Sequence, residues 1–330
     1  MRSLYLLRSH GTAGVEGEQV VVRCRGEEID RVRLPLLDQI LVMGNLQLST
    51  PLLKACLSRN IPIAYLSSQG WCHGRVLPIE AGYRHRARHQ AGLAEGERLS
   101  AAVSLVAGKI GNGRVLLQRL TRRSRRELVV TSIERLGWHE RTARKATSIE
   151  RLRGLEGNAA AEYFKALGLL LEDDGFLFLG RHQRPPTTPF DAVSSFGYSL
   201  LWNCLLTHVE LQGLDPYEGV LHAGSARHAA LVSDLIEPLR TLLVDPLNVW
   251  LIRTGQLRVD DAFEQREKGV FLTEVGRRVW LRAWSTRMAE TVALPLGHNG
   301  SRWELLDGLV RSYVRFVYDP AQGLMVPRRR

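Results

Sequence analysis

Glu156 is the first side chain whose position points to chemistry. It lies in the segment RGLEGNAAAEYFKAL, where a helix over residues 154–171 puts it on one face with Ala160, Tyr163 and Leu167. That face is otherwise apolar, and an ionised carboxylate there is costly unless a cation or a hydrogen-bond donor meets it. The plainer alternative is a glutamate in the first helical turn, which the helix dipole favours and which water still reaches.

A second group of candidate residues lies in HAGSARHAALVSDLIEPLR, residues 222–240. A helix that begins near Ser225 puts Asp234 and Glu237 three positions apart on one edge, with His222 in the turn before it. Two carboxylates and an imidazole can bind Mg²⁺ or Mn²⁺, and Mn²⁺ tolerates the nitrogen better. A solvated helix edge and an exposed loop histidine would explain the same residues without a metal.

His85 and His89 have a spacing that can bind zinc, because four positions along a helix bring them to one face. Three arginines, Arg84, Arg86 and Arg88, crowd the same turns. Their charge repels a dication and attracts phosphate, and no acidic residue lies between the histidines as in a zinc protease. The segment therefore predicts a basic surface that contacts DNA.

The whole chain is basic, with 45 Lys and Arg against 34 Asp and Glu and a net charge of +11. Other basic clusters are Arg122 to Arg126, Arg181 to Pro186 and Arg328 to Arg330. This surplus favours a polyanionic partner, with nucleic acid first and an anionic membrane surface second. A genome that uses arginine heavily would give the same composition without any such partner.

Several classes of protein are disfavoured. The chain contains no Walker loop, dinucleotide fingerprint or Gly-x-Ser-x-Gly elbow, so nucleotide hydrolysis and acyl transfer have no support. No segment reaches the ~20 apolar residues of a membrane span, and the apolar run before Arg8 is too short for a signal peptide. Four cysteines without a Cys-x-x-Cys pair indicate reduced thiols in a cytoplasmic protein.

The elements that must position these side chains fall into two regions. In the first, strands are expected at residues 4–7, 19–24, 29–34, 36–43, 61–66 and 71–77. A turn is expected at 11–17, and Ser49 is expected to cap a short helix. In the second, helices are expected at 98–120 with interruptions at Gly111 and Gly113, and at 124–136, 142–153, 154–171, 192–211, 226–244, 272–287 and 303–317.

These patterns predict an α+β fold with a small N-terminal β-rich domain, residues 1–82, followed by a larger all-α domain, residues 83–330. A β-rich domain of this size buries little core by itself, so we expect it to contribute to dimerisation. The larger domain carries the candidate catalytic and DNA-binding residues. We expect the terminal PRRR to be disordered.

Four segments, in a fixed order, resemble the CRISPR-associated adaptation integrase/endonuclease family, the first and near-universal Cas protein. They are LEGNAAAEYF (155–164), RPPTTPFDAVSSFGYSLL (184–201), DPYEGVLHAGSARHAALVSDLIEPLRTLLVD (215–245) and GVFLTEVGRR (269–278). The segment MGNLQLSTPLLKACLSRNIPIAYLSSQG is similar to part of the family's β domain. The resemblance therefore covers most of the chain.

The resemblance implies that Glu156, His222 and Glu237 bind one divalent ion, Mg²⁺ or Mn²⁺. Asp234 then lies beside the metal or serves as an additional ligand. The implied reaction is phosphoryl transfer, in which the 3′-hydroxyl of spacer DNA attacks a phosphodiester and the metal stabilises the developing charge. With water as nucleophile, the same site acts as a nuclease.

The resemblance also implies partners. They are double-stranded DNA, as spacer precursor and as the leader–repeat of the CRISPR array, a second copy in a homodimer, and a small ferredoxin-like Cas protein that completes a heterohexamer. No membrane is involved. Two other functions remain open: a related transposase-type integrase with the same site, and a non-catalytic basic scaffold that binds DNA.

Overall fold

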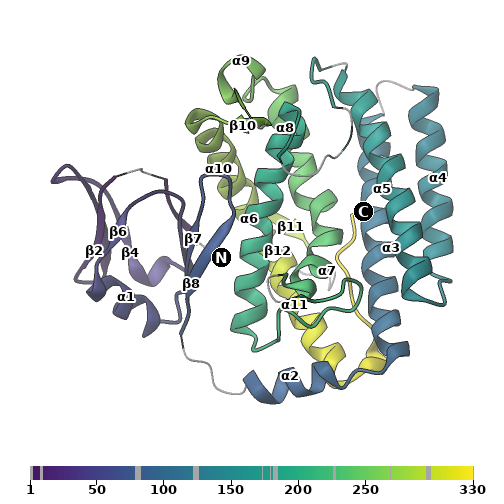
Figure 1. The fold of residues 1–330 in the computed structure, drawn as a ribbon, viewed down its shortest axis with the longest axis horizontal. Coiled ribbons are helices and arrows are strands. Elements are labelled where there is room, and N and C mark those ends of the chain that lie inside the picture. Colours follow the sequence, from purple (N-terminus) through teal and green to yellow (C-terminus); the bar gives the residue numbers. More distant parts are fainter. Residues whose placement is uncertain are drawn as a thin grey trace. The chain divides into compact units, whose positions relative to one another are not determined.

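The computed structural model describes residues 3–7, 10–78, 83–121, 126–172, 174–178, 180, 185–225, 228–267, 269–294 and 299–329. The chain divides into two compact units, Met1–Ala81 and Gly82–Arg330. The first is rich in strands and the second is mainly helical (Figure 1). This confirms the predicted fold class, a small β-rich region followed by a larger helical one.

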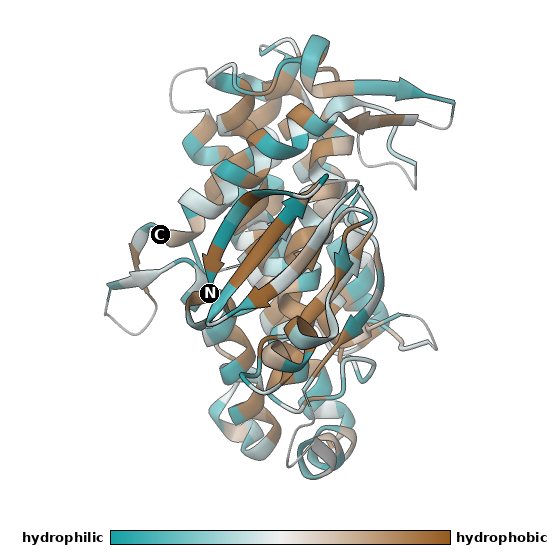
Figure 2. Cartoon of the chain, turned by 90° about the vertical axis from the view of Figure 1, so that its left-hand side faces the viewer, coloured by the Kyte–Doolittle hydropathy of each residue, from teal (hydrophilic) through white to brown (hydrophobic). Residues whose placement is uncertain are grey.

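The described residues of the N-terminal unit form two four-stranded sheets. In order of hydrogen bonding, the first is β1 (Ser3–Leu6), β5 (Gln39–Val42), β7 (Ile63–Leu66) and β8 (Cys72–Val76). The second is β4 (Glu27–Arg33), β3 (Gln19–Cys24), β2 (Thr12–Glu16) and β6 (Gln47–Leu48). Hydrophobic and hydrophilic residues both occur along single strands (Figure 2). Buried side chains from both sheets, among them Leu6, Val20 and Ile40, form one core.

One segment of this unit differs from the sequence prediction. Residues 12–16, expected in a turn, form β2, which pairs antiparallel with β3. Gly11 and Gly17, with φ of 137° and 57°, mark the two ends of this strand. The predicted helix cap is present, since the Ser49 hydroxyl accepts a hydrogen bond from the Leu52 N–H in α1 (Thr50–Leu57). A 3-10 turn, η1 (Leu34–Leu36), precedes β5.

The second unit is built mainly from helices. They are α2 (Tyr83–Ala91), α3 (Glu95–Leu120), α4 (Glu127–Ala143), α5 (Ile149–Glu172), α6 (Pro189–Leu211), α7 (Ala230–Leu239), α8 (Asp245–Arg253), α9 (Val259–Ala262), α10 (Glu274–Ala289) and α11 (Trp303–Tyr318), with the short turns η2 (Arg240–Val244) and η3 (Pro320–Gln322). Two hairpins that the sequence patterns did not predict join them: β9 (Phe263–Arg266) with β10 (Gly269–Leu272), and β11 (Thr291–Ala293) with β12 (Asn299–Ser301).

Helix α3 packs against α4, α5 and α7, and so reaches every helix that carries a candidate carboxylate (Figure 1). Gly111 and Gly113 do not interrupt it. A Cβ at Gly111 would lie 3.1 Å from a carboxylate oxygen of Glu140, and one at Gly113 would lie 3.1 Å from the ring of Tyr163. The glycines therefore let neighbouring helices approach α3, rather than breaking it. The segment expected as a separate helix at 142–153 is instead divided between two helices, because α4 ends at Ala143 and α5 begins at Ile149.

The helix expected at 226–244 begins later and changes form within that range. Helix α7 starts at Ala230 and contains Pro238, and the chain then continues through the π-helical turn η2 into α8. Proline lacks an N–H and clashes with the preceding turn, so it cannot complete a regular α-helical ladder. Wider π turns occur often at functional sites. This one begins at Arg240, three residues after Glu237.

The C-terminal strap, residues 324–329, is ordered, so the expectation that the PRRR tail is disordered was wrong for residues 327–329. Asn112 of α3 donates hydrogen bonds to the carbonyls of Pro238 and Pro327, both at 3.0 Å. Its own side-chain oxygen accepts from the Arg329 N–H at 2.7 Å. Arg329 also donates to the Leu242 carbonyl. One buried amide thus ties the strap to α3 and to the end of α7.

Candidate active site

Glu156 lies two turns into α5 and not in the first turn, because the helix begins at Ile149. Its side chain is 23% exposed and forms an ion pair with Lys109 of α3. The apolar face of α5 therefore meets a cation at this position. This arrangement matches the expectation that a carboxylate here needs a positive partner.

Glu237, on α7, is almost fully buried and faces the same ammonium. Its Oε2 lies 2.5 Å from Lys109 Nζ, and its Oε1 lies 3.1 Å from Arg240 Nη1. Burial alone would raise the pKa of Glu237, but Arg240 and Lys109 outweigh burial and lower it to about 2. Burial likewise opposes the charge on Lys109, and Glu237 and Glu156 overcome it, so the pKa of Lys109 is raised.

His222 lies in the turn before α7, and Asp234 organises that turn. The fully buried Asp234 carboxylate accepts backbone N–H bonds from Val220, Leu221 and His222 at 2.6, 2.9 and 3.0 Å. It also contacts His222 Nδ1 at 2.5 Å, and this hydrogen bond, set against burial, raises the pKa of His222. With Nδ1 engaged, Nε2 is the ring nitrogen left for a ligand.

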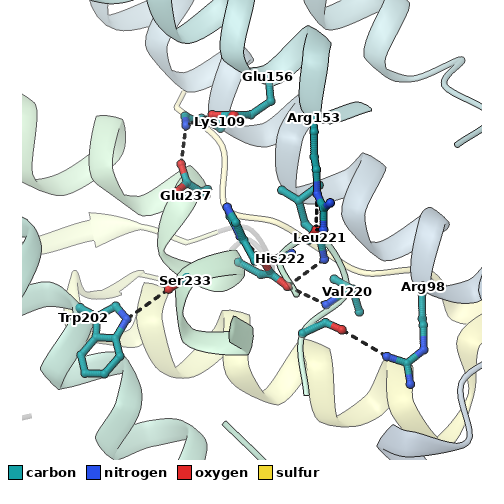
Figure 3. A network of polar contacts seen from close by, with 12 residues as sticks. Arg98, Lys109, Arg153, Glu156, Trp202, Val220, Leu221, His222, Ser233 and Glu237 are labelled. Atoms are coloured by element: carbon teal, nitrogen blue, oxygen red, sulfur yellow. Dashed lines mark hydrogen bonds and ion pairs between the residues drawn. The ribbon is translucent and has the colours of Figure 1, made fainter. Parts of the chain in front are cut away.

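The backbone of this turn is held from several helices (Figure 3). Arg153 of α5 donates to the Leu221 carbonyl at 2.8 Å, and Arg98 of α3 donates to the Gly219 carbonyl at 3.2 Å. A Cβ at Gly219 would come within 2.8 Å of Asp234, so only glycine fits there. The buried side chain of Gln90 adds hydrogen bonds to the carbonyls of residues 215 and 218.

The three sequence-predicted ligands approach one region from α5, α7 and the turn before α7. Figure 3 shows Lys109 between Glu156 and Glu237, with the ring of His222 pointing toward the Glu237 side. Both glutamates act electrostatically on His222. Among the described residues, no three His, Cys, Asp or Glu side chains lie close enough to hold an ion as they stand. The ammonium of Lys109 is the cation that the carboxylates share.

A buried polar network lies behind the two glutamates. Asp245 accepts hydrogen bonds from Tyr163 of α5 at 2.7 Å and from Tyr198 of α6 at 2.5 Å. The guanidinium of Arg240 lies 4.9 Å from the centre of the Tyr198 ring. This network fixes α5 and α6 to the start of α8, and thereby the spacing of the helices that carry the site. A cleft of about 650 Å³ opens beside His222.

The rival histidine pair forms part of an aromatic cluster. The rings of His85 and His89 are 4.8 Å apart, and His85 Nδ1 lies 3.3 Å from the Tyr318 hydroxyl. No third metal-binding side chain joins them in the described part of the chain. Of the other basic clusters, residues 122–125, 181–184 and 330 lie outside the described residues.

Sequence reasoning missed the residues that orient the site. Lys109 lies 47 positions from Glu156 along the chain and belongs to no candidate motif. Arg153 and Gln90 adjoin candidate segments, but no pattern around them predicts that they bind the turn before α7. The segment around Lys109 (VAGKIGNG) contains one pattern that could have indicated its role, a single charged residue among small and apolar ones. Small residues mark close helix packing, and a charge there needs a partner.

Comparison with known proteins assigns the family. The family model described as CRISPR associated protein Cas1 matches residues 4–286. A CRISPR-associated endonuclease Cas1 of Thermus thermophilus is 35% identical over 297 residues, which cover 89% of each chain. A Cas1 protein from Thermotoga maritima has the same fold, with a TM-score of 0.82, 24% identity and 97% of both chains covered.

A chain of a Cas6-RT-Cas1–Cas2 complex also shares the fold, with a TM-score of 0.81 and 23% identity over 96% of this chain and 35% of that chain. No helix among the described residues is long and apolar enough to cross a membrane. The family model matches most of the chain, and the Thermus thermophilus relative is 35% identical over 89% of it. The chain belongs to the Cas1 family of CRISPR-associated endonucleases.

Proposed function

We propose that the helical unit carries a metal-dependent phosphoryl-transfer site with Glu156, His222 and Glu237 as ligands. The observation that supports this most is the convergence of two carboxylates, from α5 and α7, on one shared cation. Glu237 Oε2 is buried without an aligned hydrogen-bond donor, although Lys109 Nζ is close to it. This donor set of two carboxylates and one imidazole suits Mg²⁺ or Mn²⁺.

Asp234 fits a supporting role better than a ligand role. Its two oxygens already accept three backbone N–H groups and the His222 ring. By holding Nδ1, it keeps Nε2 directed away from the turn, as carboxylates behind metal-binding histidines do. We therefore assign Asp234 to orienting His222, and not to the metal.

The reaction is a transesterification, in which a spacer 3′-hydroxyl attacks a phosphodiester of the CRISPR array, the new P–O bond replaces one P–O bond of the array strand, and the displaced oxygen leaves as a hydroxyl group. With water as the nucleophile, the same exchange is hydrolysis. When bound, the ion supplies charge stabilisation at the scissile phosphate. The chain contributes positioning: Asp234 fixes the imidazole, Arg153 fixes the turn that carries it, and the buried Asp245 network fixes helix spacing. Arg240 adds a positive charge beside Glu237 that can face a phosphate oxygen.

The function implies partners. Family membership supports DNA and another Cas protein as partners, and a related fold occurs in a complex that contains Cas2. We propose a homodimer to which residues 1–82 contribute, and a heterohexamer with a small ferredoxin-like Cas protein. Because the array is chromosomal DNA, the location that fits this activity is the cytoplasm.

Strand transfer by purified ligand variants tests the proposal. Glu156→Gln, His222→Ala and Glu237→Gln should each lose metal-dependent spacer integration and nuclease activity by about 100-fold or more, and should still bind DNA. Glu150→Gln is the matched control, because it is exposed on the same helix and lies away from the site. Integration by a folded Glu156→Gln protein at the wild-type rate would disprove the site. DNA binding without any metal-dependent cleavage or joining by wild type would favour the scaffold alternative.

A further inference from the structure

Lys109 lies where a cation bound between the two proposed ligands would lie. Its ammonium pairs with Glu156, is 2.5 Å from Glu237 Oε2, and belongs to a side chain that is only 14% exposed. Bonds from Mg²⁺ to oxygen ligands are about 2.0 to 2.1 Å long. A divalent ion bound to both carboxylates would therefore overlap the present position of the Lys109 ammonium. The ion and the ammonium cannot be there together.

We propose that Lys109 is an internal counter-cation of the active site, which neutralises Glu156 and Glu237 in the metal-free protein and withdraws when a divalent ion binds. This inference rests on the proposed metal site. It adds a residue that sets metal affinity and is not itself a ligand. Without such a cation, two carboxylates that share a poorly solvated site would repel each other.

The residue type supports the proposal. Of the 45 Lys and Arg residues only five are lysines, namely Lys54, Lys109, Lys145, Lys165 and Lys268, and the rest are arginines. In this arginine-rich chain, the charge shared by both carboxylates is nevertheless a lysine. A lysine ammonium is compact and sits on a flexible four-carbon stem, whereas a guanidinium forms a rigid, planar fork. The lysine can thus release both carboxylates by rotating its stem.

The surroundings allow that movement. A cavity of about 30 Å³, lined by Lys109, Glu156, Tyr198 and Arg240 among others, adjoins the ammonium. That volume is roughly the share of one water molecule in the liquid, so it can receive an ammonium group. Arg240 stays paired with Glu237 Oε1 at 3.1 Å and does not have to move. Withdrawal of Lys109 then exposes one oxygen of each glutamate on the same side.

Competition between Lys109 and the metal has a measurable consequence. The ion must displace a paired ammonium, so wild type binds it more weakly than a protein without that charge. In Lys109→Met, which keeps the length of the stem, Mn²⁺ should bind about tenfold more tightly, within the usual range of coupling between two bound groups. The metal-free variant should melt at a lower temperature. A residue with a merely structural role would weaken metal binding when replaced.

The experiment titrates Mn²⁺ into metal-stripped full-length protein by calorimetry. Lys165→Met is the matched control, because it makes the same substitution at an exposed position of α5 and should leave the affinity unchanged. Glu156→Gln combined with Lys109→Met should lose the tight site and so identifies where the ion binds. If folded Lys109→Met binds Mn²⁺ no more tightly than wild type, the counter-cation role is wrong.

A measurement on wild type decides the question even if the variant does not fold. With only five lysines, the ¹³Cε signals of a lysine-labelled protein can be assigned by single substitutions. Saturating Mg²⁺ should shift the Lys109 signal and leave Lys165 unchanged. A Lys109 signal that stays in place while Mg²⁺ binds through Glu156 overturns this inference alone. Failure of wild type to bind Mn²⁺ or Mg²⁺ in a Glu156-dependent way overturns the metal site together with it.

Discussion

Asp234 is the residue whose loss should separate metal binding from DNA binding most clearly. Asp234→Asn keeps the shape of the side chain but removes its charge and one of its two acceptor oxygens. Three backbone N–H groups and the His222 ring now contact those oxygens. Residues behind a metal-binding histidine typically contribute 10- to 100-fold to metal affinity. We expect a loss of about that size in Mn²⁺ affinity and in strand transfer, and a lower free energy of unfolding by about 1 to 3 kcal/mol.

Calorimetric Mn²⁺ titration and urea unfolding of Asp234→Asn measure these two effects. Asp174→Asn serves as control, because its carboxylate pairs with Arg253 away from the site. DNA affinity should be unchanged in both variants. An Asp234→Asn protein with wild-type metal affinity would show that this carboxylate does not orient His222.

His222 should make the stability of the metal-free protein depend on pH. Its hydrogen bond with Asp234 raises the pKa of the folded-state imidazole above the ordinary value of about 6.5. The folded state therefore binds the proton more tightly than the unfolded state. The resulting stabilisation is complete below about pH 6.5 and is lost as pH rises through the raised folded-state pKa.

Urea unfolding of metal-free wild type and of His222→Gln, from about pH 6 to about pH 9, isolates this effect. The difference in unfolding free energy between the two proteins should shrink as pH rises. A difference in unfolding free energy that stays constant, or that grows with pH, would contradict a raised pKa of His222 in the folded protein. Metal binding should show the opposite trend, because a ligating imidazole must lose its proton.

At the residue scale, the sequence indicated which residues could be ligands, but it did not indicate which side chains surround them in the fold. Glu156 could be placed on an apolar face from the helical period alone. Its partner Lys109 lies 47 positions away along the chain, and only the packing of α3 against α5 brings the two together. Joining Glu156, His222 and Glu237 into one site required family resemblance, because periodicity relates residues only within one element.

At the element scale, Asn112 ties three segments together, and its replacement should be costly. Asn112→Ala leaves the carbonyls of Pro238 and Pro327 and the N–H of Arg329 without their present partner. An unsatisfied buried group costs about 1 to 3 kcal/mol, and relaxation of the strap recovers part of that. We expect a loss of about 2 to 4 kcal/mol in the free energy of unfolding.

Thermal and urea unfolding of Asn112→Ala test this expectation against Asn158→Ala, which changes an exposed asparagine on α5. The control should lie within about 0.5 kcal/mol of wild type. If Asn112→Ala is as stable as wild type, the hydrogen bonds of Asn112 contribute nothing to the stability of the helical unit. Protease sensitivity near residue 324 should rise in the variant.

Elements with strong periodicity were predictable, and those set by distant contacts were not. Strand β3 was located exactly as residues 19–24, and α6 to within three residues. The order of the strap was missed because its partners are Asn112 and the end of α7, and the charged tail has no pattern of its own. The change from α7 to η2 near Pro238 was likewise not predicted, because the apolar residues continue at helical spacing through this segment.

At the scale of the whole molecule, the net charge of +11 predicts salt-sensitive binding to DNA. Phosphate contacts release counterions, so the logarithm of the affinity should fall linearly with the logarithm of salt concentration. Replacing Arg86 and Arg88 by glutamate should reduce affinity for any sequence and flatten that slope. Fluorescence anisotropy at several salt concentrations measures both effects, and salt-independent binding would contradict the electrostatic origin.

The strap also bears on how the chain folds. Its hydrogen bond from the Arg329 N–H to Asn112 joins residues 217 positions apart. Contacts that close such long loops form late, because the entropy of closure is lost before the contact repays it. The strap should therefore bind to α3 only after the rest of the helical unit has assembled. In the native state, the strap should be among the first segments to exchange its amide hydrogens.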